Sequence, residues 1–154
     1  MGQVTSVIVD ASLAIKWVLD EEHSLEARTQ RVRWAIRNID VRVPSWFGCE
    51  IANVLFQSIR SQRLTLEEAE LKMGVVASFV SVLDVEFDLA PRALRIALAT
   101  GQKASYDSYY VALAEHHDCE LWTADVRFWR TVNPAFPFVQ WLGNERIAAE
   151  PEAQ

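Results

Sequence analysis

Close to its start the chain reads Val7-Ile8-Val9-Asp10-Ala11-Ser12-Leu13, an apolar run closed by an aspartate. Continuous apolar runs are typical of strands that are buried on both faces of a parallel sheet. We expect such a strand over residues 4–9, with Asp10 at its carboxyl end. The apolar positions that follow, among them Leu13, Ile15 and Trp17, predict a short helix over residues 11–19.

The rest of the chain alternates between the same two kinds of element. Thr65 and Glu68 form a capping box, which is a strong signal for the start of a helix. Strands alternating with helices imply a parallel sheet covered on both faces, so the predicted fold class is α/β, with three α/β/α layers around a mostly parallel sheet. We predict strands at 4–9, 41–43, 82–85, 120–123 and 136–139, and helices at 11–19, 24–39, 45–59, 65–80, 89–99, 105–117 and 125–131, with Ser24 as a cap.

The length and composition bound the organisation of the protein. A chain of 154 residues with 51% apolar residues is long enough for one domain with its own core. We therefore expect a single domain over residues 1–145 and a disordered tail over 146–154. The N-terminus carries no targeting segment, and no apolar run reaches the roughly 20 residues of a membrane span, which predicts a cytoplasmic protein.

The formal charge of −6 argues against a protein that holds nucleic acid by bulk electrostatics alone. It leaves a nuclease open, because clustered carboxylates become locally neutral or positive when they bind a divalent cation. The two cysteines match no metal or redox spacing. Only five glycines are present and none is clustered after the first strand, so a phosphate-cradling Rossmann loop is excluded.

Four acids draw attention by their positions. Asp10 and Asp125 follow predicted strands, and functional sites of open α/β sheets lie beyond the carboxyl ends of the strands. Asp107 falls in the first turn of a predicted helix, and Glu50 lies inside another among apolar neighbours. Each has an ordinary alternative: Asp10 and Asp125 as helix caps, Asp107 as a favourable charge at a helix N-terminus, and Glu50 as a surface residue.

Taken together, the four acids suggest a shared task. Carboxylates gathered at one end of a sheet repel one another, and this raises their pKa values and couples their titrations. A bound Mg²⁺ or Mn²⁺ relieves the repulsion, since hard cations take oxygen ligands. Spacing in the sequence does not by itself bring the four together in space.

Four blocks of the sequence resemble the PIN-domain family, and in particular the VapC-type toxin ribonucleases of type II toxin–antitoxin systems. The resemblance covers the chain from about residue 4 to 140, with the blocks in the order of the family. They read VIVDASLAIKW at 7–17, PSWFGCEIANVL at 44–55, SYDSYYVALAE at 105–115 and LWTAD at 121–125.

The resemblance implies a metal-dependent endoribonuclease that uses Mg²⁺, or Mn²⁺, to hydrolyse RNA phosphodiester bonds. The acidic quartet of the family matches Asp10, Glu50, Asp107 and Asp125, which are the predicted catalytic and metal-binding residues. Asp10 and Asp107 are expected to hold the principal ion, with one-metal and two-metal mechanisms both open. Ser12, Asn53 and Thr123 fall in positions from which they would orient the acids or a bound water.

The resemblance also implies partners: an RNA substrate, a cognate VapB-like antitoxin in a groove formed by the early helices, and a second copy of the chain in a homodimer. Trp17, Trp34 and Trp46 lie on the helices of that groove, where they would either anchor the antitoxin or belong to the core. Trp122, on a predicted strand, is expected in the core; it replaces the usual small aliphatic residue of the fourth block.

Four other functions are compared with this pattern of residues. A stand-alone RNA-processing PIN nuclease would share the whole site, whereas a catalytically inactive PIN-like binding module is disfavoured because no member of the quartet is missing. A phosphoacceptor receiver-like domain needs adjacent acids after the first strand, and a haloacid-dehalogenase-like phosphatase needs a second acid two residues after the first. Ala11 and Ser12 stand at these positions instead.

Overall fold

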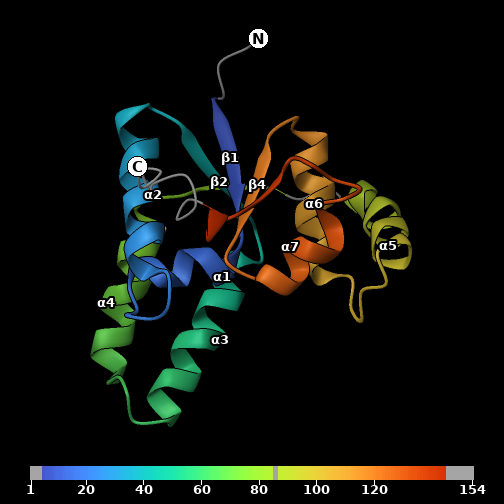
Figure 1. Ribbon diagram of the computed structural model, residues 1–154. Helices are drawn as coiled ribbons and strands as arrows, with labels where there is room; N and C mark the ends of the chain where they lie inside the picture. The colour runs from blue at the N-terminus through green and yellow to red at the C-terminus, as the bar shows by residue number, and fades with distance from the viewer. Residues whose placement is uncertain (1–4, 85–86, 145–154) are drawn as a thin grey trace, which may run out of the picture.

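Five strands form one sheet in which every neighbouring pair is parallel, in the order β3-β2-β1-β4-β5. The computed structural model describes residues 5–84 and 87–144 (Figure 1). The predicted disordered tail lies outside the described residues. The strands are β1 (Ser6–Val9), β2 (Asp40–Pro44), β3 (Ser81–Leu83), β4 (Glu120–Thr123) and β5 (Val139–Trp141).

The central strand β1 is buried on both faces, as the apolar run predicts. Val7 and Val9 point into one hydrophobic cluster and Ile8 into another, because successive side chains of a strand point to opposite faces. The neighbouring strand β4 divides its side chains in the same way, with Trp122 in the first cluster and Leu121 in the second. The sheet therefore separates two cores.

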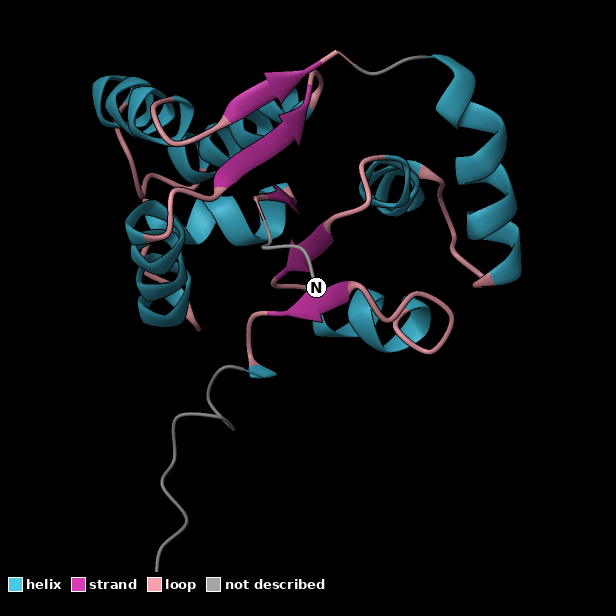
Figure 2. Cartoon of the chain, turned by 90° about the horizontal axis from the view of Figure 1, so that it is seen from above, coloured by secondary structure: helices cyan, strands magenta, loops and turns pink. Residues whose placement is uncertain are grey.

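Helices cover both of these cores, which confirms the three-layer α/β/α fold (Figures 1 and 2). The helices of the first half pack on one face, and those of the second half on the other. The first group is α1 (Ala11–Ala14), the 3-10 turn η1 (Ile15–Trp17), α2 (Ser24–Ile36), α3 (Phe47–Arg60) and α4 (Leu66–Ala77). The second group is the 3-10 turn η2 (Phe87–Leu89), α5 (Ala90–Ala99), α6 (Tyr106–His116) and α7 (Val126–Val132).

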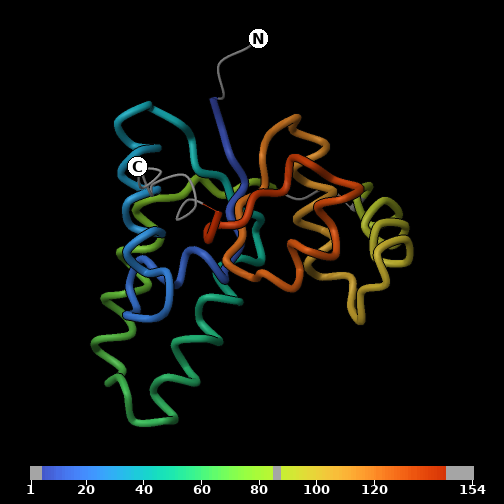
Figure 3. The backbone as a smooth tube through the Cα atoms, in the orientation of Figure 1, coloured from blue at the N-terminus to red at the C-terminus, as the bar shows by residue number. Residues whose placement is uncertain are grey.

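Helices α3 and α4 form a hairpin that extends away from the sheet (Figure 3). The capping box predicted at the start of α4 is present. The backbone N–H of Thr65 donates to Glu68 Oε2 at 2.8 Å, and the Glu68 N–H donates to Thr65 Oγ1 at 3.2 Å. Within the described ranges, none of the helices combines the length and the apolar character that a bilayer span requires.

Some predicted boundaries are wrong. Ser24 is not the cap of α2 but its first residue, and its hydroxyl binds the preceding loop by donating to the Leu19 carbonyl. The capping position belongs to His23, which has a positive φ of 65°. The last strand was expected at 136–139, but β5 begins at Val139, where its register with Leu121 starts; Phe136 and Phe138 pack from the preceding loop.

The tryptophans divide between core and surface. Trp17 and Trp34 are buried, so the structure supports the core alternative for both rather than an antitoxin anchor. Trp34 meets Trp122 edge to face, with ring centroids 5.6 Å apart, and Trp122 is in the core as predicted. Trp46 is half-buried and packs on Tyr109 and Tyr110.

Candidate active site

The candidate site lies where β1 and β4 end side by side. These two strands are parallel neighbours, so Asp10, directly after β1, and Asp125, two residues after β4, lie at the same edge of the sheet. The chain runs outward from β1 through β2 on one side and β4 on the other. Such a reversal of strand order is where open α/β sheets bind their ligands.

Asp10 accepts hydrogen bonds on both of its carboxylate oxygens. Its side chain is buried, with 6% of the residue exposed. The Ser12 hydroxyl and the Leu13 N–H donate to Oδ1, at 2.7 and 3.1 Å, and the Thr123 hydroxyl donates to Oδ2 at 2.5 Å. Asp10 thus does cap α1, but its second oxygen faces the neighbouring strand end.

The same two hydroxyls connect the ends of the strands. Ser12 Oγ accepts the N–H of Ala124 at 3.1 Å, and Thr123 Oγ1 accepts the N–H of Asp125 at 3.0 Å. Thr123 is fully buried. The backbone that carries Asp125 is therefore tied to the side chains that orient Asp10, and the relative position of these two acids is set by hydrogen bonds.

The pKa of Asp10 is raised from 3.8 to about 7, mainly because burial disfavours the charged carboxylate. The hydrogen bonds from Thr123, Ser12 and Leu13 lower it, and the negative charge of Asp107 raises it further. The groups that offset burial are neutral hydroxyls and a backbone N–H. The carboxylate is thus oriented by the protein without a cationic partner of its own among these contacts.

Asp107 and Asp125 lie on the more open side of the site. Asp107 is exposed in the first turn of α6, yet protein atoms around its carboxyl and the charge of Asp125 raise its pKa. Asp125 is the cap of α7, and its Oδ1 accepts the N–H groups of Arg127 and Phe128 at 2.9 and 3.1 Å. The capping alternative for Asp125 is correct, and it leaves Oδ2 outside these bonds.

Glu50 enters the site from α3 and is held by a residue that the sequence analysis did not single out. The Tyr110 hydroxyl donates to Glu50 Oε1 at 2.7 Å. Partial burial raises the pKa of Glu50, and the charge of Asp107 adds to the increase. Tyr110, one turn beyond Asp107 on α6, is 1% exposed, and burial together with Glu50, Asp10 and Asp107 raises its pKa as well.

Electrostatic coupling links the four acids through Asp107, which raises the pKa of Asp10 and of Glu50 and is itself affected by Asp125. In the part of the chain that the structure describes, no group of three or more acidic, histidine or cysteine side chains is arranged so that it could hold a metal ion. The chemistry of the donor set nevertheless fits a hard divalent cation, since it consists of carboxylates without a neutralising partner. Their side chains would have to converge to share one ion.

Asn53 and two arginines of α2 take no part in these hydrogen bonds. Asn53 is exposed on α3, and no hydrogen bond joins it to an acid within the described residues. Arg28 binds the carbonyls of Trp17 and Leu19 and the carboxylate of Asp20, which gives it a structural task. The Arg31 guanidinium stacks on Phe79, 3.8 Å from the ring centroid.

Comparisons with known proteins identify a sequence family and two similar folds. A sequence model described as the PIN domain matches residues 7–133. The crystal structure of PAE2754 from Pyrobaculum aerophilum is 22% identical, with a TM-score of 0.67 over 97% of this chain and 100% of that one. A toxin–antitoxin complex from Klebsiella pneumoniae contains a chain 15% identical, with a TM-score of 0.61 over 88% of this chain and 97% of that one. At such identities the likeness shows the fold alone. No curated protein sequence matches the chain.

Proposed function

Because the chain belongs to the PIN domain family, whose members are generally metal-dependent nucleases, we propose that it is an endoribonuclease acting through Asp10, Glu50, Asp107 and Asp125. The main support for the proposal is the environment of the Asp10 carboxylate. Its carboxylate is buried at the point where strand order reverses, is oriented by two hydroxyls, and is coupled to the charge of Asp107. A buried charge without a partner is expensive, so such a group is retained for a ligand.

In this mechanism the acids divide the work. Asp10 and Asp107 would hold the cation, usually Mg²⁺ in this family, and Glu50 and Asp125 would complete the site. When bound, the ion acidifies water and neutralises charge that develops on the phosphate. Ser12 and Thr123 keep Asp10 in one orientation. Tyr110 holds Glu50 in place by donating a hydrogen bond to its Oε1.

The test is cleavage of a structured RNA pool by purified, partner-free protein in Mg²⁺, Mn²⁺ or EDTA, with Asp10→Asn as the control. We expect cleavage that requires the metal and disappears in the variant. Asparagine keeps the size of the side chain and the capping oxygen, so the fold should survive. Cleavage by Asp10→Asn at the wild-type rate would refute the site. No cleavage by folded protein with any metal would favour the inactive binding module.

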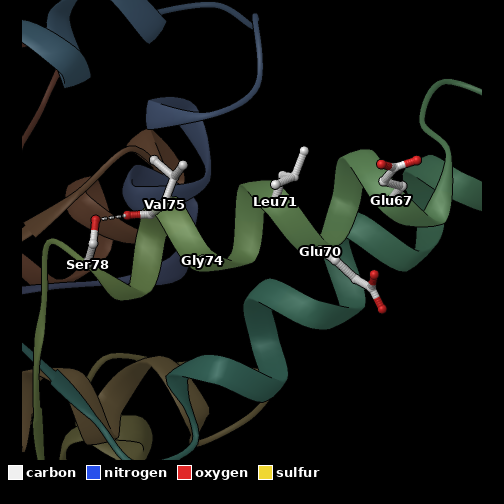
Figure 4. A pocket seen from close by; sticks show the side chains of 6 residues that line it. All are labelled: Glu67, Glu70, Leu71, Gly74, Val75 and Ser78. Atoms are coloured by element: carbon white, nitrogen blue, oxygen red, sulfur yellow. Dashed lines mark hydrogen bonds between the residues drawn. The ribbon is translucent and has the colours of Figure 1, made fainter.

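We further infer that the nuclease is a VapC-type toxin inhibited by a VapB-like antitoxin. The similarity in fold to a chain of a toxin–antitoxin complex supports this role. So do exposed apolar side chains on two early helices, Leu25, Val32 and Ile36 on α2 and Leu71 and Val75 on α4. Leu71 and Val75 border a hollow of about 530 Å³ along α4 (Figure 4). Exposed apolar surface of this kind is typical of protein interfaces.

The toxin role and the stand-alone RNA-processing role differ in what expression does to a cell. Induced expression of a toxin arrests bacterial growth, and the arrest requires the intact site, so Asp10→Asn should grow normally. A processing nuclease would leave growth unchanged in both cases. Substituting Leu71→Glu on α4 should release the antitoxin while leaving cleavage by the free enzyme intact. The homodimer remains a prediction, measurable by sedimentation of the purified chain.

A further inference from the structure

A pocket adjoins the candidate site at Asp125. The pocket, of about 450 Å³, is lined by Ala124 and Val126, the residues on either side of Asp125. Its other walls include Lys16 of η1, Arg130 of α7 and Trp141 of β5. We call it the Lys16–Arg130 pocket. A ligand that reaches the acids of this sheet edge and extends past Asp125 would enter it.

The polar lining of the pocket includes a cation, Arg130, that has no carboxylate partner among the described residues. The chain has a formal charge of −6. The pocket is lined by two cations, Lys16 and Arg130, and one carboxylate, Glu22, and Lys16 is in addition paired with Glu21. Arg130 is exposed and makes no hydrogen bond or ion pair with any described residue. Its guanidinium is therefore available to an outside anion, and a guanidinium matches the geometry of phosphate oxygens.

Lys16 is the more buried of the two cations. Its side chain is 14% exposed, and its Nζ lies 3.2 Å from Glu21 Oε2. This ion pair holds the ammonium group at the wall of the pocket. An ammonium has three donors, so Lys16 can bind a phosphate while keeping the bond to Glu21.

The third wall is rigid because Trp141 is packed from several sides. Its ring stacks on Trp129, with centroids 5.6 Å apart, and meets the edge of His23 at 5.9 Å. Gly143 lies against the ring so closely that a Cβ atom there would be 2.1 Å from Trp141 Cζ2. Only glycine allows this approach, and the wall is thereby fixed before a ligand binds.

We propose that the Lys16–Arg130 pocket binds the RNA nucleotide next to the scissile phosphate, with the phosphate of that nucleotide on Arg130 and Lys16. This inference rests on the proposed nuclease function. It adds the path of the RNA strand, which would run from the four acids past Asp125 toward α7 and β5. Arg130 supplies the unpaired charge for this contact, and Lys16 adds the donors that its bond to Glu21 leaves over. RNA is favoured over an acidic peptide because two residues of the lining, Ala124 and Val126, flank Asp125 of the proposed nuclease site, so the pocket adjoins the place where RNA would be cut.

The experiment measures binding of a fluorescein-labelled single-stranded RNA of about ten nucleotides by anisotropy, with Ca²⁺ as an oxygen-seeking ion in place of Mg²⁺. Arg130→Ala is compared with Arg127→Ala, which removes the same charge from the same helix outside the pocket. We expect Arg130→Ala to weaken binding about tenfold and to reduce the slope of log K against log salt by about 0.7, the value for one phosphate contact on a single strand. Arg127→Ala should leave that slope unchanged.

Gly143→Ala gives a second, charge-neutral test of the same pocket. The added methyl group must displace Trp141, so RNA binding should weaken while the number of cations stays the same. Thermal melting of each variant establishes that it is folded. Gly143→Ala that binds RNA as tightly as the wild type would show that the Trp141 wall takes no part.

The outcomes separate the pocket from the nuclease. Equal binding by Arg130→Ala, Arg127→Ala and the wild type, or an equal loss in both variants, overturns the pocket even if the wild type cleaves RNA in Mg²⁺. An Arg130-dependent salt slope in a protein that never cleaves RNA upholds RNA binding by the pocket, but refutes the nuclease and with it the position next to a scissile phosphate. If Arg130→Ala abolishes binding of polyglutamate but leaves RNA binding unchanged, the pocket belongs to an acidic protein partner and the proposal is wrong.

Discussion

Asp107 and Glu115 stand near opposite ends of α6, and the protein surrounds them in opposite ways. Glu115 receives two hydrogen bonds of 2.7 Å from the Arg92 guanidinium, and these bonds lower its pKa. Asp107 has Asp125 as its charged neighbour, and partial burial together with that charge raises its pKa. Along one helix, the protein thus supplies a cation for one acid and further acids for the other.

The difference indicates which carboxylates are structural and which are kept for a ligand. Asp40 repeats the pattern of Glu115, because Arg42 and Ser81 bind it and lower its pKa. Asp10 and Glu50 repeat the pattern of Asp107, with neutral donors and neighbouring acids. Of these five carboxylates, the three without a cationic partner, Asp10, Glu50 and Asp107, are coupled to one another at one edge of the sheet.

The largest expected effect contrasts the two ends of α6 directly. Asp107→Asn should reduce metal-dependent RNA cleavage at least about a thousandfold, or roughly 4 kcal/mol in the barrier, because a group that holds the ion is lost. Glu115→Gln should leave cleavage within about twofold of the wild type, since its loss breaks only a surface ion pair. Single-turnover rates of both variants measure this. Equal losses would mean that the ends of α6 do not differ in function.

The next effect concerns stability and pH. The folded-state pKa of Asp10, about 7, exceeds the ordinary value of 3.8, so the folded protein holds this proton more tightly than the unfolded chain does. The resulting stabilisation is fully present below pH 4 and is lost as the pH rises through 7. In EDTA we expect a loss on the order of 2 to 4 kcal/mol. Mg²⁺ should restore stability above pH 7.

Urea unfolding at pH 5 and pH 8 measures this loss, with Asp10→Asn as the matched control. The variant lacks the titrating group, so the change between the two pH values should be smaller than in the wild type by the same amount. A pH dependence identical in both proteins would show that Asp10 carries no raised pKa.

A smaller effect is expected at Tyr110. Tyr110→Phe removes the hydroxyl that holds Glu50, and loss of such an outer partner typically weakens metal binding by about tenfold or somewhat more. Tyr109→Phe is the matched control, because the neighbouring ring packs on Trp46 and its hydroxyl has no partner within the described residues. Calorimetric titration with Mn²⁺ compares the two. Identical affinities would leave Tyr110 with a packing role alone.

The smallest expected effect is on stability, from the ion pair between Arg92 and Glu115 near the C-terminal end of α6. Arg92→Ala breaks the bond to Glu115, but both side chains are more than a third exposed, so solvent screens the pair. We expect a loss below about 1 kcal/mol that shrinks further in high salt. Chemical denaturation at low and high salt measures it. A loss several times larger would contradict the description of this pair as a surface contact.

Much of the fold and the positions of the acids could be predicted from the sequence. The apolar run before Asp10 and the run at 120–123 identify strands whose carboxyl ends carry acids, and the rule for parallel sheets places those ends together. The capping box at Thr65 is a local signal and is present as expected. These features depend on neighbouring residues, which a sequence shows directly.

What the sequence did not reveal depends on contacts between distant residues. Tyr110 looks like one more apolar position of a helix, and only packing brings its hydroxyl to Glu50, 60 residues away. Phe136 and Phe138 resemble a strand, but the register with β4 begins at Val139, and an apolar run does not fix register. The Lys16–Arg130 pocket joins residues from both halves of the chain, and no spacing in the sequence indicates it.

The most direct test of the central claim is a measurement of Mn²⁺ binding by electron paramagnetic resonance in the wild type, Asp10→Asn and Glu115→Gln. Asp10 is one of the acids without a cationic partner at the sheet edge, whereas Glu115 is paired with Arg92. The account predicts that the wild type and Glu115→Gln bind the ion equally. Asp10→Asn should bind it more than about a hundredfold less tightly, beyond what loss of an outer partner costs. Equal binding by all three proteins would contradict it.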